Sequence, residues 1–200
     1  MPTGVALRDV RQQLFDAAER VLLRDGATGL TSRAVTDEAG VAKGVLHRHF
    51  ADFDAFLADL VRERVRRLAA EAADLRAAAG RGTVAGNLTA ALIQLFDPVA
   101  VSIVGLVIFR DELRARLRQD RPEAGVPVLA EAAAMIGGYL GEERAMGRIA
   151  ADAEVDALAL SLVGAGHLLF ADRDGAAPDP EGVEKVVRAV IADVVQRRLL

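Results

Sequence analysis

Apolar residues recur at three- and four-residue spacing over most of this chain, and no stretch sustains an alternation with a period of two. The first spacing places apolar side chains along one face of an α-helix, whereas a half-buried strand needs the second. The pattern therefore predicts an all-α protein of about nine helices.

Glycine, proline and capping residues divide this pattern into segments. Asp97-Pro98 and Asp179-Pro180 each combine an N-cap with a proline at the first helical position, where no N–H is needed. Segment 98–109 is apolar nearly all round, so we expect it to be buried. Segment 110–119 is either a charged continuation of that helix or a separate short one. The other expected helices are 7–25, 32–39, 42–49, 53–79, 83–96, 125–147, 152–172 and 180–200.

The composition excludes several classes of protein. None of the 200 residues is a cysteine, which excludes disulfides, thiolate nucleophiles and cysteine-ligated zinc or iron–sulfur sites. Helical di-metal sites need a glutamate three residues before a histidine, but Gly44, Leu46 and Gly164 hold those positions before the histidines of this chain. No nucleophile–base pair is evident either, so we expect no enzyme, no metal and no cofactor.

Charge is distributed unevenly along the chain. The net charge is −4, whereas residues 1–50 carry a net charge of +1. An acidic body is not expected to coat nucleic acid, but it is compatible with a small basic face. The longest apolar run, Pro98–Phe109, falls well short of the ~20 residues that span a bilayer, and the first residues lack a secretory pattern. We therefore expect a cytoplasmic protein without membrane contact.

The two short segments 32–39 and 42–49 fit a helix-turn-helix, in which the first helix braces a second that enters the DNA major groove. Gly40 supplies the turn, and Thr36 is small enough for the helix contact. The inward-facing apolar positions are Val35, Ala39, Val41 and Leu46. The positions left for the groove are Arg33, Lys43, His47 and Arg48.

The stretch GATGLTSRAVTDEAGVAKGVLHRHFADFDAFL, residues 26–57, resembles the signature of the tetracycline-repressor (TetR) family of bacterial transcriptional regulators. AGVAKGVLHRHF is its most specific part. The resemblance covers about the first quarter of the chain, and the remaining helices fit the family by number, length and order. It implies a helix-turn-helix DNA-binding domain at 1–51 and a helical effector-binding and dimerisation domain at 52–200.

The resemblance assigns DNA-contacting roles to individual residues. Thr31 and Ser32 would bind a phosphate, and Arg33 a phosphate or a base edge. The recognition helix would begin at Lys43 and Gly44, with the glycine allowing a close approach of the backbone to DNA. The other residues implied are Val45, His47 and Arg48 toward the groove and His49 toward the flanking phosphates.

Three positions depart from the family pattern. The family usually has tyrosine where His47 stands, so an imidazole replaces a phenol as the phosphate contact. Phe53 replaces a lysine at the start of the fourth helix, which removes a charge directed at phosphate. Thr36 replaces an alanine at the contact between the two short helices.

An effector site and a dimer interface are also implied. Members of the family bind effectors between helices that here carry Phe96, Phe109, Met135, Tyr139 and His167, although each of these residues also fits an ordinary core position. The last two helices have apolar stripes that fit a four-helix bundle between two subunits or, alternatively, the core of the chain itself. The interface residues expected are Val155, Leu158, Leu162, Leu169, Val183, Val187, Val190 and Val194.

These features predict a homodimeric transcriptional regulator, most simply a repressor, that binds operator DNA and is released by a small, mostly apolar or weakly acidic molecule. The alternative is a helical regulator that acts through a protein partner with weak or no DNA binding. The modest basicity of residues 1–50 and the presence of Phe53 keep this alternative open.

Overall fold

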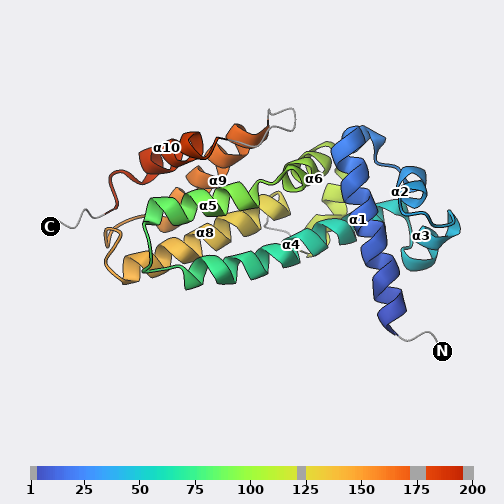
Figure 1. Ribbon diagram of the computed structural model, residues 1–200, viewed down its shortest axis with the longest axis horizontal. Helices are drawn as coiled ribbons and strands as arrows, with labels where there is room; N and C mark the ends of the chain where they lie inside the picture. Colours follow the sequence, from blue (N-terminus) through green and yellow to red (C-terminus); the bar gives the residue numbers. More distant parts are fainter. Residues whose placement is uncertain (1–3, 121–124, 172–178, 196–200) are drawn as a thin grey trace. The chain divides into compact units, whose positions relative to one another are not determined.

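The computed structural model describes residues 4–120, 125–171 and 179–195, with side chains from residue 10 onward except that of Asp120. These residues form ten α-helices and no strand, which confirms the all-α prediction (Figure 1). The chain leaves the helical conformation at Arg110, so the charged segment that follows is a separate helix. The helices are α1 Gly4–Gly29, α2 Ser32–Glu38, α3 Gly44–His49, α4 Phe53–Ala77, α5 Val84–Leu95, α6 Pro98–Phe109, α7 Asp111–Asp120, α8 Pro127–Ala145, α9 Val155–Ala171 and α10 Pro180–Ile191.

Side chains cap the first turns of two helices, α2 with a residue not predicted as a cap and α10 with the predicted one. Thr31 accepts a hydrogen bond from the Ala34 N–H at 3.1 Å, which starts α2. Asp179 accepts one from Glu181 N–H at 3.1 Å, directly beside the proline that opens α10. Gly26 has a φ of 69° and interrupts α1 where the first helix was predicted to end. The last helix ends at Ile191, earlier than predicted, and residues 196–200 lie outside the described ranges.

The chain divides into two compact units, residues 1–63 with 98–126 and residues 64–97 with 127–200. This division differs from the boundary expected between residues 51 and 52. The reason is that α6 returns to pack against α1, so the apolar helix predicted to be central completes the core of the first unit. The long helix α4 contributes its first turns to one unit and its remaining turns to the other.

An aromatic cluster forms part of the core of the first unit. Phe50, which follows α3, lies 5.9 Å from Phe15 of α1 and 5.0 Å from Phe56 of α4, measured between ring centroids. Arg11 covers this cluster, with its guanidinium carbon 4.3 Å from the centre of the Phe50 ring. The same arginine donates to the His49 carbonyl and forms an ion pair with Asp59 at 2.7 Å. The end of α3 is therefore fixed to both α1 and α4.

The second unit contains α5, α8, α9 and α10 together with the later turns of α4. Helix α9 packs against α8 and α10, and α10 also packs against α5 (Figure 1). Gly166 of α9 lies so close to Phe96 that a Cβ there would be 2.5 Å from the ring. No single helix among the described residues is long and apolar enough to cross a membrane, and only the bent pair α5 and α6 passes that test together, by length and composition.

A buried polar network joins α5, α8 and the turn after α4. The Tyr139 hydroxyl donates to Glu143 Oε1 at 2.6 Å and accepts from the Asn87 amide at 3.0 Å. Arg148 forms an ion pair with the fully buried Glu143 at 3.2 Å, and the Gly80 N–H donates to the same carboxylate. Burial, together with the Glu143 carboxylate, raises the pKa of the Tyr139 hydroxyl, so it stays protonated and donates.

We predict that Tyr139→Phe lowers the free energy of unfolding by about 1–3 kcal/mol, because it leaves the buried Glu143 carboxylate without its shortest donor. Urea denaturation followed by circular dichroism measures the change. Ser161→Ala is the control, since that exposed hydroxyl donates only to the Ala157 carbonyl of its own helix. A Tyr139→Phe protein as stable as the parent would show that the network does not contribute to stability.

Candidate functional site

Helices α2 and α3 pack through their inner faces and leave the outer face of α3 in solvent. Gly40 has a φ of 67°, as the predicted turn requires, and Val35 and Leu46 are fully buried. The buried Thr36 hydroxyl lies 3.1 Å from the Ser32 carbonyl and 3.0 Å from the Arg33 carbonyl, so its polar group is satisfied inside α2. The threonine that replaces the usual alanine therefore fits this contact without an orphaned hydroxyl.

The exposed face of α3 carries positive charge that no nearby acid neutralises. Lys43, His47 and Arg48 are exposed, and none of them forms an ion pair with a described residue. Behind them, Glu38 binds two arginines of α1, Arg20 and Arg24, each at 2.7 Å. Glu38 is thus directed toward α1, and the cations at α3 remain available to an anionic partner.

The other predicted DNA contacts lie on α2 and α3 or directly before α2. Thr31 is exposed but its hydroxyl already caps α2, whereas Arg33 is exposed and lies 3.5 Å from Asp37. Gly44 has open space where a Cβ would stand, which leaves the backbone accessible. Ser32, Val45 and His49 are half-buried. The structure therefore gathers all nine predicted residues around α2 and α3.

Phe53, at the position where the family has lysine, points inward. Its ring stacks on Phe56 at 5.7 Å with 19° between the planes, and the Arg110 guanidinium carbon lies 5.7 Å from its centre. Arg110 also pairs with Asp54 at 3.0 Å. The first turn of α4 is thereby attached to the link between α6 and α7 by stacking and by an ion pair.

A second ion pair supports the same turn. Asp52 accepts a hydrogen bond from the Ala55 N–H at 2.6 Å, as an N-cap does, and its other oxygen lies 2.9 Å from Arg116 of α7. The backbone N–H, followed by the arginine, lowers the pKa of the Asp52 carboxyl. The cap therefore remains ionised well into the acid range.

Residues 14–60 match the profile of bacterial regulatory proteins of the tetR family. The N-terminal domain belongs to the TetR family. The match contains α2, α3 and the start of α4, which are the elements that form the exposed cationic face. The helix-turn-helix of this chain is thus of the type found in the N-terminal domain of TetR-family regulators.

Solved structures show that the TetR-like fold extends over the whole chain. A TetR-family transcriptional regulator from Mesorhizobium loti has a TM-score of 0.70 at 16% identity, over 97% of this chain and 100% of that one. FadR from Bacillus subtilis, in complex with stearoyl-CoA, has a TM-score of 0.68 at 17% identity, over 90% and 97%. The multidrug binding protein EbrR, complexed with imidazole, has a TM-score of 0.61 at 20% identity, over 90% and 94%. A comparison with curated protein sequences gives no match.

The predicted effector residues do not form one site. Met135 lines a cleft, but Phe96 packs in the core against His167 and Phe170, with ring centroids 6.2 Å and 5.3 Å away. Tyr139 is fully buried in the network with Glu143 described above. Phe109 belongs to the first unit and is 83% exposed.

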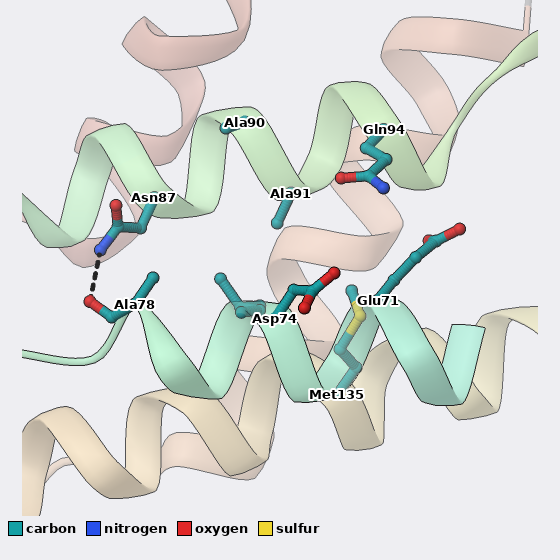
Figure 2. Close-up of a pocket in the computed structure, with 9 residues that line it drawn as sticks. Glu71, Asp74, Ala78, Asn87, Ala90, Ala91, Gln94 and Met135 are labelled. Atoms are coloured by element: carbon teal, nitrogen blue, oxygen red, sulfur yellow. Dashed lines mark hydrogen bonds between the residues drawn. The ribbon is translucent and has the colours of Figure 1, made fainter. Parts of the chain in front are cut away.

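The cleft that contains Met135 lies between α4, α5 and α8, has a volume of about 190 Å³ and is partly open to solvent. Figure 2 shows Glu71 and Asp74 on the α4 side and Gln94 on the α5 side. Sequence analysis missed these polar residues because acids on an amphipathic helix resemble an ordinary solvated face. The lining residues are Glu71, Asp74, Leu75, Ala78, Asn87, Ala90, Ala91, Gln94 and Met135.

The expected interface residues separate into two groups. Leu162, Val183 and Val187 are buried within the chain, so the structure corrects their assignment to a subunit interface: they belong to the chain's own core. Val155, Leu158, Leu169, Val190 and Val194 are half-buried. Sequence analysis missed Leu160 and Leu168 of α9, which are 67% and 77% exposed.

We predict that Phe53→Lys destabilises the TetR-type domain by about 1–2 kcal/mol, because it removes an aromatic pair and brings a second cation toward Arg110. Phe53→Leu keeps an apolar side chain and should lose less. Urea denaturation of both variants measures the difference. If the lysine variant matched the leucine variant in stability, the guanidinium would have no effect at this position.

Proposed function

We propose that this chain is a homodimeric transcriptional repressor of the TetR type that binds a near-palindromic operator and is released by a small molecule. The observation that carries the proposal is the exposed outer face of α3, where Lys43, His47 and Arg48 have no acidic partner among the described residues. Inserted in the major groove, this face would bring its cations to the phosphates and its half-buried Val45 near the bases.

Dimerisation is supported by the exposed face of α9. Leu160, Gly164 and Leu168 follow one another at four-residue spacing, and all three are exposed. Two leucines of this exposure on one helix face favour burial against the same face of a second copy, with the glycine allowing close approach. A dimer would present two recognition helices, which specific binding requires at a separation of ~34–36 Å.

Effector response is supported by the cleft in the second unit and by two relatives of the fold that are solved with bound small molecules, stearoyl-CoA and imidazole. The ligand would act by preferring one spacing of the two DNA-binding domains. A nearly complete switch requires a preference of ~5.5 kcal/mol between the two states. A cleft that encloses most of the ligand can supply such a difference.

We predict that Lys43→Ala weakens binding to every duplex by a similar factor, about tenfold, and reduces the slope of log affinity against log salt by about 1. Lys185→Ala is the matched control, because it removes the only other lysine, which is exposed on α10. Fluorescence anisotropy with duplexes selected from a random pool measures both quantities. If selection enriched no duplex, the proposal would fail and the alternative of a protein partner would be favoured.

We predict that Leu168→Lys converts the protein to a monomer at micromolar concentration, because it places a charge in the centre of the proposed α9 interface. Leu23→Lys is the control, since Leu23 is 49% exposed on α1 in the first unit. Sedimentation velocity distinguishes the two masses. A parent protein that is itself monomeric at high concentration would contradict the dimer.

A further inference from the structure

We propose that the cleft between α4, α5 and α8 binds a small organic cation with an apolar body. This inference deepens the proposed function, on which it rests only for the biological role of the ligand. It departs from the apolar or weakly acidic effector expected from the sequence, and the charge of the cleft is the reason.

The two carboxylates of the cleft lack partners. Glu71 and Asp74 stand three residues apart on one face of α4, and neither side chain forms a hydrogen bond or an ion pair with a described residue. The side chain of Arg64, two turns before Glu71 on the same helix, is more than nine-tenths buried and lies 2.7 Å from Asp97. The Arg64 guanidinium is therefore already paired with another acid, and neither carboxylate of the cleft has an ion-pair partner of its own among the described residues.

Partial burial makes the charge of Glu71 costly in the free protein, whereas Asp74 at the edge of the cleft is exposed. Desolvation raises the pKa of Glu71, and the carboxylates of Asp97 and Asp74 act in the same direction, whereas Arg64 and Arg67 oppose it. A cation that enters the cleft supplies the missing counter-charge, so its binding is favoured by an interaction that a neutral ligand cannot make. The attraction between the cation and the carboxylates is strongest where water is partly excluded.

The other walls of the cleft determine the rest of the ligand. Leu75, Met135, Ala90 and Ala91 offer apolar contact, and no arginine, lysine or histidine is among the lining residues. The Asn87 amide N–H groups already face the Ala78 and Arg81 carbonyls and the Tyr139 hydroxyl. Apart from Gln94, the cleft therefore presents acceptors, and a carboxylate or phosphate ligand would find no cation to bind it.

The spatial arrangement fits a ligand with charge at one side. In Figure 2 both acids extend from α4 into the space that α5 closes from the opposite side, while the Met135 side chain reaches in from α8. A quaternary ammonium group could lie beside the two carboxylates with an aromatic or alkyl body along Leu75 and Met135. A cleft volume of about 190 Å³ is below that of drug-sized sites and suits a small molecule of about a dozen heavy atoms.

Isothermal titration calorimetry with three probes of similar size tests the proposal: benzyltrimethylammonium, neutral N-benzylacetamide and anionic 3-phenylpropionate. We expect the ammonium to bind at least tenfold more tightly than the amide, and the carboxylate to show no binding. Glu71→Gln and Asp74→Asn should each weaken ammonium binding by roughly fivefold or more, the effect expected of one nearby unit charge in a largely aqueous setting. Neither change should affect the amide.

Glu142→Gln is the matched control, because it removes an exposed acid of α8 that does not line the cleft. Equal affinity for the ammonium and the amide, or unchanged ammonium affinity in both cleft variants, would overturn the proposal. Circular dichroism melts verify that each variant is folded. Glu71→Lys tests the charge preference independently, because reversing the charge should abolish ammonium binding and allow phenylpropionate to bind.

The titrations contain no DNA, so their outcome is independent of operator binding. Adding the ammonium to a protein–duplex complex then tests the biological role separately. Binding to the cleft without any change in duplex affinity would support the cation site and contradict the proposed release mechanism. Duplex binding that responds to other molecules, with no ammonium bound in the cleft, would contradict the cation site and leave the regulator intact.

Discussion

Packing of the Phe15, Phe50 and Phe56 rings holds the recognition helix from the side that faces the protein. Helix α3 has only six residues, too few to be stable alone, and its C-terminal end is fixed by Phe50 and by the arginine that lies over that ring. Leu46 on the inner face of α3 is fully buried, and the opposite face of α3 therefore lies in solvent. The direction in which its cations point is thus a consequence of the apolar core, and DNA binding depends on that direction.

In both units, some charged side chains form ion pairs inside the protein, whereas the candidate functional groups do not. Arg24 and Arg64 each meet an acid at 2.7 Å, Glu38 in one unit and Asp97 in the other, so their fields are largely cancelled. Ion pairs on the surface contribute little to stability, but they remove charge from places where it would attract a ligand. The cations at the exposed face of α3 form no such pair with a described residue, and neither do the two carboxylates of the cleft. The α3 face and the cleft therefore offer groups of opposite charge, although the chain as a whole is only mildly acidic.

Features set by neighbouring residues could be predicted from the sequence, whereas features set by distant packing could not. The positive φ of Gly40 and the start of α2 at Ser32 follow from local conformational needs, so the helix-turn-helix was predictable, although α3 begins two residues later than predicted. The sequence around Glu71 has the same pattern whether that face of α4 is exposed to water or lines a cleft against α5. Likewise the valines of α10 fit a subunit interface or a core equally well, and only the position of α5 against them, which buries Val183, decides for the core.

Phe53 at the start of α4 packs inside the protein, whereas a lysine at this position would bind a phosphate. A lysine there would add one phosphate contact, which strengthens binding to all sequences alike and is weakened by salt. Phe53 instead packs on Phe56 and under Arg110, whose ion pair with Asp54 attaches the first turn of α4 to the link between α6 and α7. The contacts proposed from α3 to the bases are untouched by this exchange. Losing a sequence-independent contact while keeping the sequence-dependent ones lowers the affinity for operator and for non-specific DNA by the same factor. The ratio of the two affinities, which determines where a regulator resides on a genome, is therefore preserved without this contact.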